Sequence, residues 1–66
     1  MTPIPTEEQY QAGYDALDWF TCGWPHPYSD FQIRGAVIAS IRETGKFDTD
    51  RFWDALFSIA KSEHKA

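Results

Sequence analysis

Two pairs of side chains have the types and spacing that chemistry could use. Cys22 and His26 stand in a Cys-x3-His spacing, and a thiol beside an imidazole can ligate a metal or act as an activated nucleophile. Asp15 and Asp18 are three residues apart, so a helix would bring both carboxylates to one side, as a paired acid and base would require. Each pair also has a structural explanation without chemistry.

The cysteine and the histidine do not complete a metal site. A structural zinc ion takes four ligands, usually with paired cysteines, but this chain has one cysteine and its other histidine, His64, lies in the tail. Cys22 follows the expected C-terminal end of a helix, where the helix dipole and nearby Asp18 disfavour a thiolate. We therefore expect a buried thiol and a loop imidazole, with no metal and no cofactor.

The two carboxylates are expected to form a solvated helix face. A chain of 66 residues buries only about 60% of its unfolded surface and has little material for a walled catalytic pocket. We therefore predict that the protein is not an enzyme.

Charge is distributed unevenly along the chain. Residues 1–33 contain five acids and no Lys or Arg, whereas residues 34–66 contain six basic and five acidic residues, for a net charge of −4. An acidic surface repels the nucleic-acid backbone, so it favours a protein partner with a basic surface over direct nucleic-acid binding. The alternative is that the charge serves only solubility.

The compartment is inferred from the cysteine count and from what precedes the first helix. A single cysteine excludes an intramolecular disulfide, which a secreted chain of this size would usually need. No run approaches the roughly 18 apolar residues of a membrane span, and residues 1–5 do not resemble a signal peptide. We expect a cytoplasmic protein with no membrane contact.

Helix signals recur along the chain and predict an all-α fold. Thr6 with Gln9 and Ser29 with Gln32 match the capping box, and Asp48 is a candidate N-cap between Phe47 and Phe52, which suit a hydrophobic staple. Gly23 and Gly45 suit left-handed helix ends. We predict a compact three-helix domain spanning residues 1–66, with helices at 7–21, 31–44 and 49–62, a fraying tail at 62–66, and a Pro/aromatic connector at 23–28.

The aromatic residues outnumber the positions that a small core offers. The chain has eleven, and the middle helix is apolar over most of its circumference, so it is the predicted centre of the core. Helical spacing assigns eight rings to core or staple positions: Tyr10, Tyr14, Phe20, Phe31, Phe47, Phe52, Trp53 and Phe57. Trp19, Trp24 and Tyr28 are left over. Trp24 and Tyr28 either cap the open end of the core or belong to a binding surface.

Two short segments resemble known groups of proteins. Tyr10-Gln11-Ala12-Gly13-Tyr14 is similar to the Tyr-x-x-Gly-Tyr opening of ribosome modulation factors, but those are strongly basic, so their function does not carry over to this acidic half. Phe47-Asp48-Thr49-Asp50-Arg51-Phe52 resembles the ending of many short phage and mobile-element proteins. That second resemblance implies a source and no activity.

The combined features favour a non-enzymatic protein-binding module. We expect a phage or mobile-element inhibitor or adaptor that binds a basic surface of a host nucleic-acid-handling or defence complex, with anti-CRISPR-like action as one instance. The expected partner-binding residues lie in the acidic half: Glu7, Glu8, Asp15, Asp18, Trp19, Trp24 and Tyr28.

Two alternatives remain. A homodimer could hide the surplus rings in a self-complementary interface. A small DNA-binding regulator could use the last two helices as a helix-turn-helix, although its recognition helix would begin with the acidic stretch Asp48-Thr49-Asp50.

Overall fold

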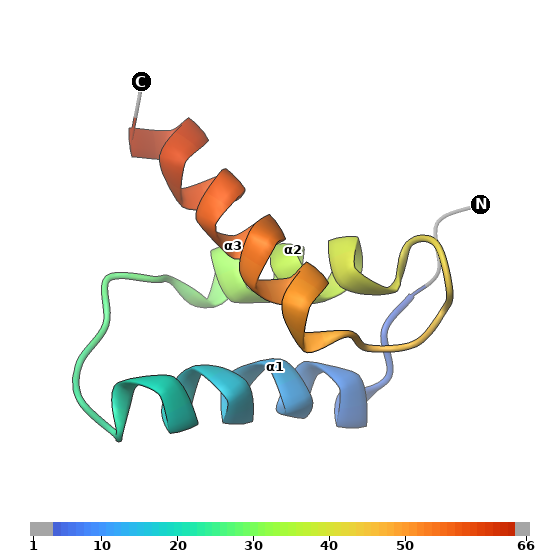
Figure 1. Cartoon of the computed structure of the whole chain (residues 1–66), viewed down its shortest axis with the longest axis horizontal. Helices are drawn as coiled ribbons and strands as arrows, with labels where there is room; N and C mark the ends of the chain where they lie inside the picture. Colours follow the sequence, from blue (N-terminus) through green and yellow to red (C-terminus); the bar gives the residue numbers. More distant parts are fainter. Residues whose placement is uncertain (1–3, 65–66) are drawn as a thin grey trace.

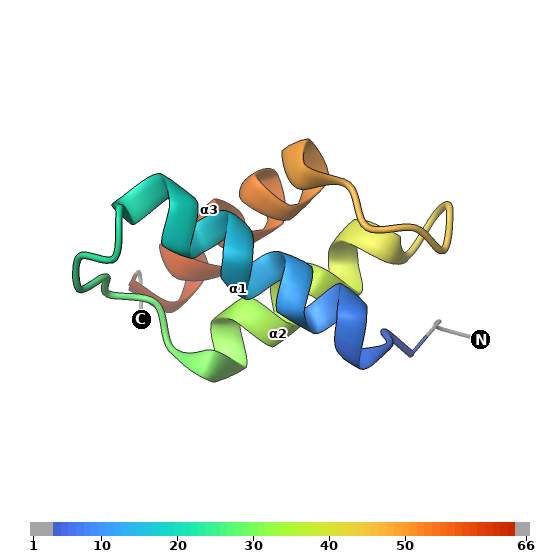
Figure 2. The same cartoon turned by 90° about the horizontal axis from the view of Figure 1, so that it is seen from below.

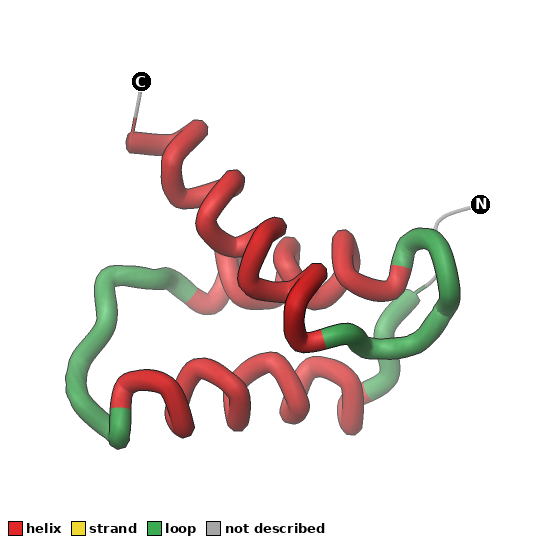
Figure 3. Tube along the Cα trace, viewed as in Figure 1, coloured by secondary structure: helices red, strands yellow, loops and turns green. Residues whose placement is uncertain are grey.

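Each helix begins at a residue whose side chain caps it, as the sequence predicts. The computed structural model describes residues 4–64, which form α1 (Glu7–Thr21), α2 (Asp30–Ile41) and α3 (Thr49–His64), with no strand among them (Figures 1 and 3). Capping boxes are present at Thr6 with Gln9 and at Ser29 with Gln32, each with both reciprocal hydrogen bonds. The predicted all-α three-helix fold is confirmed.

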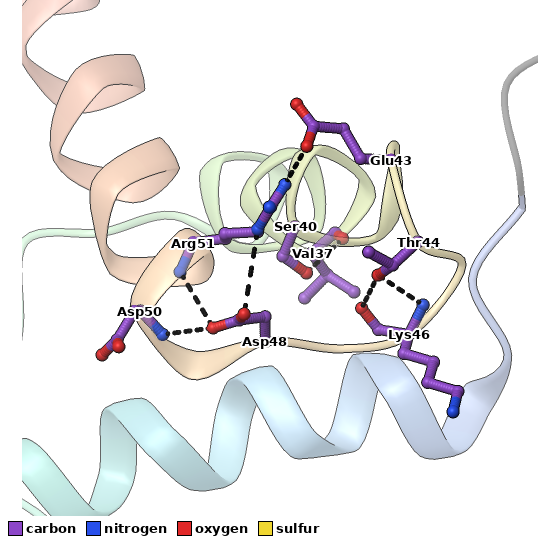
Figure 4. Close-up of polar contacts among 8 residues, drawn as sticks. All are labelled: Val37, Ser40, Glu43, Thr44, Lys46, Asp48, Asp50 and Arg51. Atoms are coloured by element: carbon purple, nitrogen blue, oxygen red, sulfur yellow. Dashed lines mark hydrogen bonds and ion pairs between the residues drawn. The ribbon is translucent and has the colours of Figure 1, made fainter.

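The segment between α2 and α3 is held by short-range polar contacts (Figure 4). Asp48 Oδ1 accepts hydrogen bonds from the backbone N–H groups of Asp50 (2.9 Å) and Arg51 (3.3 Å), which makes Asp48 the N-cap of α3. The rings of Phe47 and Phe52 lie 5.5 Å apart, which confirms the staple. The Arg51 guanidinium also pairs with the carboxylate of Glu43, so it ties the start of α3 to the residues that follow α2.

The helix ends differ in part from the prediction. Gly23 adopts the expected left-handed conformation (φ 80°), but Cys22 before it is left-handed as well (φ 54°). α2 ends at Ile41 and not at residue 44, because residues 42–44 form a turn that the Gly45 N–H closes on the Ile41 carbonyl at 2.8 Å. α3 continues to His64, beyond the predicted end at 62, since no Gly or Pro interrupts it; residues 65 and 66 of the expected frayed tail lie outside the described range.

The helices form an open arrangement around α2. α1 and α2 run in opposite directions, and the C-terminal end of α3 points away from α1 (Figure 1). Figure 2 shows the same molecule from below, with α1 in front of the other two helices. α2 packs against both neighbours and supplies much of the core, as predicted. The fully buried hydrophobic side chains are Leu17, Ile33, Ala36, Val37, Ile41, Phe52 and Leu56.

Two small residues, Ser40 and Gly13, are buried where a larger or unpaired side chain would be costly. The buried Ser40 hydroxyl donates to the Val37 carbonyl at 2.8 Å, so its polar group is satisfied within α2. Gly13 is buried on α1, and a Cβ added there would lie 2.5 Å from Val37 Cγ2 and 3.2 Å from a ring carbon of Phe52. The absence of a side chain at position 13 is therefore what allows α1 to approach this closely.

Three rings assigned to core positions are exposed instead. Phe20, near the C-terminal end of α1, is 68% exposed, and α3 points away from α1 toward its own C-terminal end (Figure 1). Phe31 is 80% exposed, since it projects from a side of α2 opposite to Ile33. Phe57 is about half exposed, because Leu56 and Phe52 already occupy the core-facing side of α3.

Candidate functional site

The side chains of Cys22 and His26 each have a hydrogen-bond partner in the backbone. The Cys22 sulfur contacts the Trp19 carbonyl at 3.9 Å, and His26 Nδ1 accepts a hydrogen bond from the Tyr28 backbone N–H at 3.3 Å. Cys22 is exposed, so the expectation of a buried thiol is wrong: the left-handed backbone that ends α1 directs this residue away from the core.

Two negative findings apply to residues 4–64. Within that range, no three His, Cys, Asp or Glu side chains gather closely enough to hold a metal ion. Nor does any helix there combine the length and the apolar character that a membrane span needs.

One side of α1 is only partly covered by α3. The residues concerned follow the i, i+3, i+4, i+7, i+8 spacing of a single helical face: Ala12, Asp15, Ala16, Trp19 and Phe20. A face with this spacing would ordinarily pack against a neighbouring helix. Here it borders a hollow whose other side is lined by Phe47, Thr49 and Trp53, and the C-terminal end of α3 points away from α1.

That hollow, the α1–α3 groove, is the larger of two that meet at Trp19. It has a volume of about 640 Å³ and is lined by Ala12, Asp15, Ala16, Trp19, Phe20, Phe47, Thr49 and Trp53. The second, the Asp18 hollow, has a volume of about 610 Å³ and is lined by Asp15, Asp18, Trp19, Cys22 and Gly23. Asp15 and Trp19 border both, and the Trp19 side chain is 87% exposed.

The groove has a firm aromatic wall. The rings of Phe20 and Trp53 lie 4.9 Å apart, and Trp53 in turn lies 5.3 Å from Phe52 in the core. Phe57 also stacks on Trp53, with the ring centres 5.7 Å apart. These contacts attach the exposed rings to the buried core. The aromatic side chains are therefore already ordered, and a binding partner would not have to offset the entropy cost of ordering them.

The charges at the groove are all negative. Asp15 borders both hollows, Asp18 borders one, and neither lining includes a Lys, Arg or His. Gln11 Nε2 donates to Asp15 Oδ1 at 2.9 Å, which orients that carboxylate on the helix surface. A positively charged group arriving here would meet two carboxylates and an exposed indole, the combination that favours ion pairing and cation–π contact.

The structure divides the predicted partner-binding residues into separate groups. It brings together Asp15, Asp18 and Trp19. Glu7 and Glu8 occupy the first turn of α1, and Glu7 lines a different hollow beside Tyr10 and Arg34. The lining of that hollow includes the positively charged side chain of Arg34, whose guanidinium lies 4.6 Å from the centre of the Tyr10 ring.

The two connector rings behave differently from each other. Trp24 is 73% exposed and lines neither hollow that meets at Trp19. Tyr28 is half-buried and packs against the core cluster, in keeping with the capping alternative for this ring.

Several groove residues were missed by the sequence reasoning. Phe20 and Trp53 were assigned to the core, and Ala12 and Ala16 carry no chemical signal of their own. The spacing of residues 12, 15, 16, 19 and 20 predicts a single helical face, but only the position of α3 shows that this face borders a groove.

Tyr14 lies between α1 and α2, on the side away from the groove. Partial burial, followed by the charge of Asp30, raises the pKa of the Tyr14 phenol above its ordinary value of 10.0. The phenol therefore stays protonated at neutral pH and adds no charge near the acidic surface.

No protein-family model, curated protein sequence or solved structure matches this chain. The function of this site is therefore inferred from its geometry and charge alone.

Proposed function

We propose that this chain is a non-enzymatic protein-binding module that docks on a basic surface of a partner protein through the α1–α3 groove and the Asp18 hollow. One observation carries the proposal: Trp19, almost fully exposed, stands between the two hollows with Asp15 and Asp18 beside it. Exposed Trp is costly in a small soluble domain and is enriched where binding energy is concentrated.

The charge of the surface supports a basic partner. The lining of the Asp18 hollow and the α1 wall of the groove belong to residues 1–33, which contain no Lys or Arg. Acidic surfaces accelerate association with positively charged partners and repel nucleic acid and anionic membranes. A phage or mobile-element inhibitor or adaptor acting on a host nucleic-acid-handling or defence complex, anti-CRISPR-like action included, would meet such a basic surface. Cytoplasmic placement is part of the same proposal.

A homodimer is the second candidate, and Phe31 is the observation that favours it. This ring is 80% exposed, and it lines neither the groove nor the Asp18 hollow. Pairing two copies through Phe31 would not require the acidic surfaces to face each other. Sedimentation at about 50 µM, well above the Kd of a stable dimer, tests this candidate. A monomer at that concentration rejects it.

DNA binding is the third candidate and has weaker support. Of the cations that would contact DNA, Arg51 pairs with Glu43 and lies near Asp48, and Arg34 lies over the Tyr10 ring. A mobility shift at low salt, where electrostatic affinity is greatest, is the matching test.

The proposed function is tested by purifying the tagged protein with its bound partners and repeating this with variants. Trp19→Ala and Asp15→Lys/Asp18→Lys should each remove the specific partner. Phe31→Ala also removes an exposed ring but lies outside both hollows, and it should retain the partner. Circular dichroism checks that each variant keeps its helices.

Two results support the proposal only when they occur together. The captured partner must present a basic surface, and its recovery must depend on Asp15, Asp18 and Trp19. A structure of the complex in which these three side chains remain in solvent would overturn the proposal, as would partner recovery that no variant changes.

A further inference from the structure

We infer that the α1–α3 groove accepts one amphipathic α-helix of the partner, with its apolar side against Phe20 and Trp53 and a row of Lys or Arg side chains along the edge that faces Asp15 and Asp18. The inference rests on the proposed function, because it specifies which basic element of the partner is bound. It adds the shape of that element and the order of its side chains.

The shape of the groove favours a helix as the occupant. Its α1 wall is a single helical face from Ala12 to Phe20, about 12 Å long at the rise of an α-helix. The other wall is the first part of α3, with Trp53. Two diverging helices present ridges and grooves that a third helix fits, whereas a bound strand needs a sheet edge, and residues 4–64 contain no strand.

The small side chains of α1 set how closely the occupant can approach. Ala12 and Ala16 line the groove beside the larger rings of Trp19, Phe20 and Trp53, of which Phe20 and Trp53 contact each other. A large apolar side chain of the partner, such as Leu or Met, could therefore pack over the two alanines, beside the Phe20–Trp53 ring pair. Such a buried aliphatic side chain among aromatic walls is typical of helix-in-groove recognition.

The charges give the occupant its orientation. Asp15 borders the groove and Asp18 lies on the far side of Trp19, so both carboxylates are on one edge. The other wall contributes Phe47, Thr49 and Trp53, which carry no charge. A helix with basic residues on one side of its apolar stripe matches this edge, and a helix with acidic residues there would be repelled.

The test uses synthetic 18-residue peptides that contain no Trp, so that the protein's own Trp fluorescence reports binding at about 150 mM salt, where distant charges are screened. The first peptide has Leu at i, i+3, i+4 and i+7 spacing and Lys elsewhere. The second replaces Lys by Glu. The third keeps the composition of the first but scrambles the Leu positions, which removes the apolar face and retains the charge.

Variants locate the binding on the molecule. Trp19→Ala should weaken binding of the first peptide about tenfold, as expected for a central interface Trp. Asp15→Asn/Asp18→Asn should weaken it about threefold to tenfold. Glu7→Gln/Glu8→Gln makes the same change in net charge at the other end of α1 and should weaken binding less than the Asp15/Asp18 variant does. Phe31→Ala removes a ring outside the groove and should change binding less than about twofold. Amide chemical shifts should change at Ala12, Ala16, Phe20 and Trp53.

The outcomes separate this inference from the proposed function. Tighter binding of the first peptide than of the other two, with the stated dependence on variants, supports the inference. Equal binding of the scrambled peptide overturns the groove helix while leaving a basic partner in place. Shift changes confined to the Glu7 end of α1 overturn it too, as does the absence of binding by every peptide at millimolar concentration. Binding to neutral phosphatidylcholine vesicles that is lost in Trp19→Ala assigns the surface to lipid and overturns both proposals.

Discussion

The ring of Phe20 on α1 lies 4.9 Å from the ring of Trp53 on α3, with the two planes inclined by 51°. It is a direct ring contact between the two helices, although the C-terminal end of α3 points away from α1 (Figure 1). Trp53 also contacts Phe52 and Phe57, so Phe20 is connected through it to the buried core. This contact therefore attaches one wall of the groove to the core, and its contribution to the free energy of unfolding can be measured.

The Phe20–Trp53 contact should appear as a coupling in a double-mutant cycle. Phe20→Leu and Trp53→Leu keep apolar side chains but remove the ring pair, and the free energies of unfolding should show a coupling of about 0.5–1.5 kcal/mol. Urea denaturation of the wild type and the three variants measures it. A cycle of Phe31→Leu with Trp53→Leu is the control and should be additive; additivity in the Phe20 cycle would contradict the contact.

Gly13→Ala should destabilise the protein although alanine is the better helix former. Alanine gains about 1 kcal/mol of helix propensity, but its Cβ would meet Val37 Cγ2 at 2.5 Å, and overpacking of this kind costs about 1–3 kcal/mol. Because a Cβ contact under 3.0 Å forces something to shift, the cost lies in the upper part of that range, about 2–3 kcal/mol, and we expect a net loss of about 1–2 kcal/mol in urea denaturation.

Gly35→Ala is the matched control for that substitution. It makes the same change within α2, where the added Cβ would lie 3.4 Å from Ile59 Cδ1, an ordinary contact. Its effect should be neutral or stabilising by up to about 1 kcal/mol. Equal effects at the two positions would mean that the close approach at Gly13 does not occur.

Cys22→Gly should stabilise the protein. Cys22 ends α1 in the left-handed region (φ 54°), which costs a residue with a Cβ about 1–2 kcal/mol and costs glycine nothing, although glycine loses more chain entropy on folding. The expected gain is about 0.5–1 kcal/mol in the free energy of unfolding. Cys22→Ser has the same backbone cost and should leave stability unchanged. A gain in the serine variant would assign the effect to the thiol.

Arg51→Met should raise the pKa of Glu43. The hydrogen bond from the Arg51 guanidinium, together with its charge, holds the pKa of the Glu43 carboxyl below its ordinary value of 4.5. Because the pKa is lower in the folded state, this pair contributes stability above pH 4.5, and the contribution is lost as the pH falls through the lowered value.

The carboxyl ¹³C shift of Glu43, followed through an acid titration, measures that change. In Arg51→Met the midpoint should move up toward 4.5, and the stability of the variant should fall less on acidification. Arg42→Met removes the same charge from a neighbouring position and should leave the Glu43 midpoint in place. An unchanged midpoint in Arg51→Met would contradict the ion pair.

The sequence by itself determined where the helices begin. Thr6 with Gln9, Ser29 with Gln32 and Asp48 with Arg51 each lie three residues apart, so these caps form within one turn and need nothing from the rest of the chain. The apolar character of α2 over most of its circumference likewise predicted its central place, since only burial on several sides suits such a helix. The acidic character of the first half follows from composition, so the sequence alone predicts it as well.

Tertiary structure alone decided which rings stay exposed and where the groove lies. Phe20 and Gly13 point in nearly the same direction from α1, seven residues apart, yet Gly13 is buried and Phe20 is not, because α3 covers one end of that side and leaves the other. Helical periodicity gives the direction of a side chain but not the length over which a neighbouring helix follows it. The crossing of α3 over α2 sets that length and leaves Trp19 and Phe20 beside an open groove.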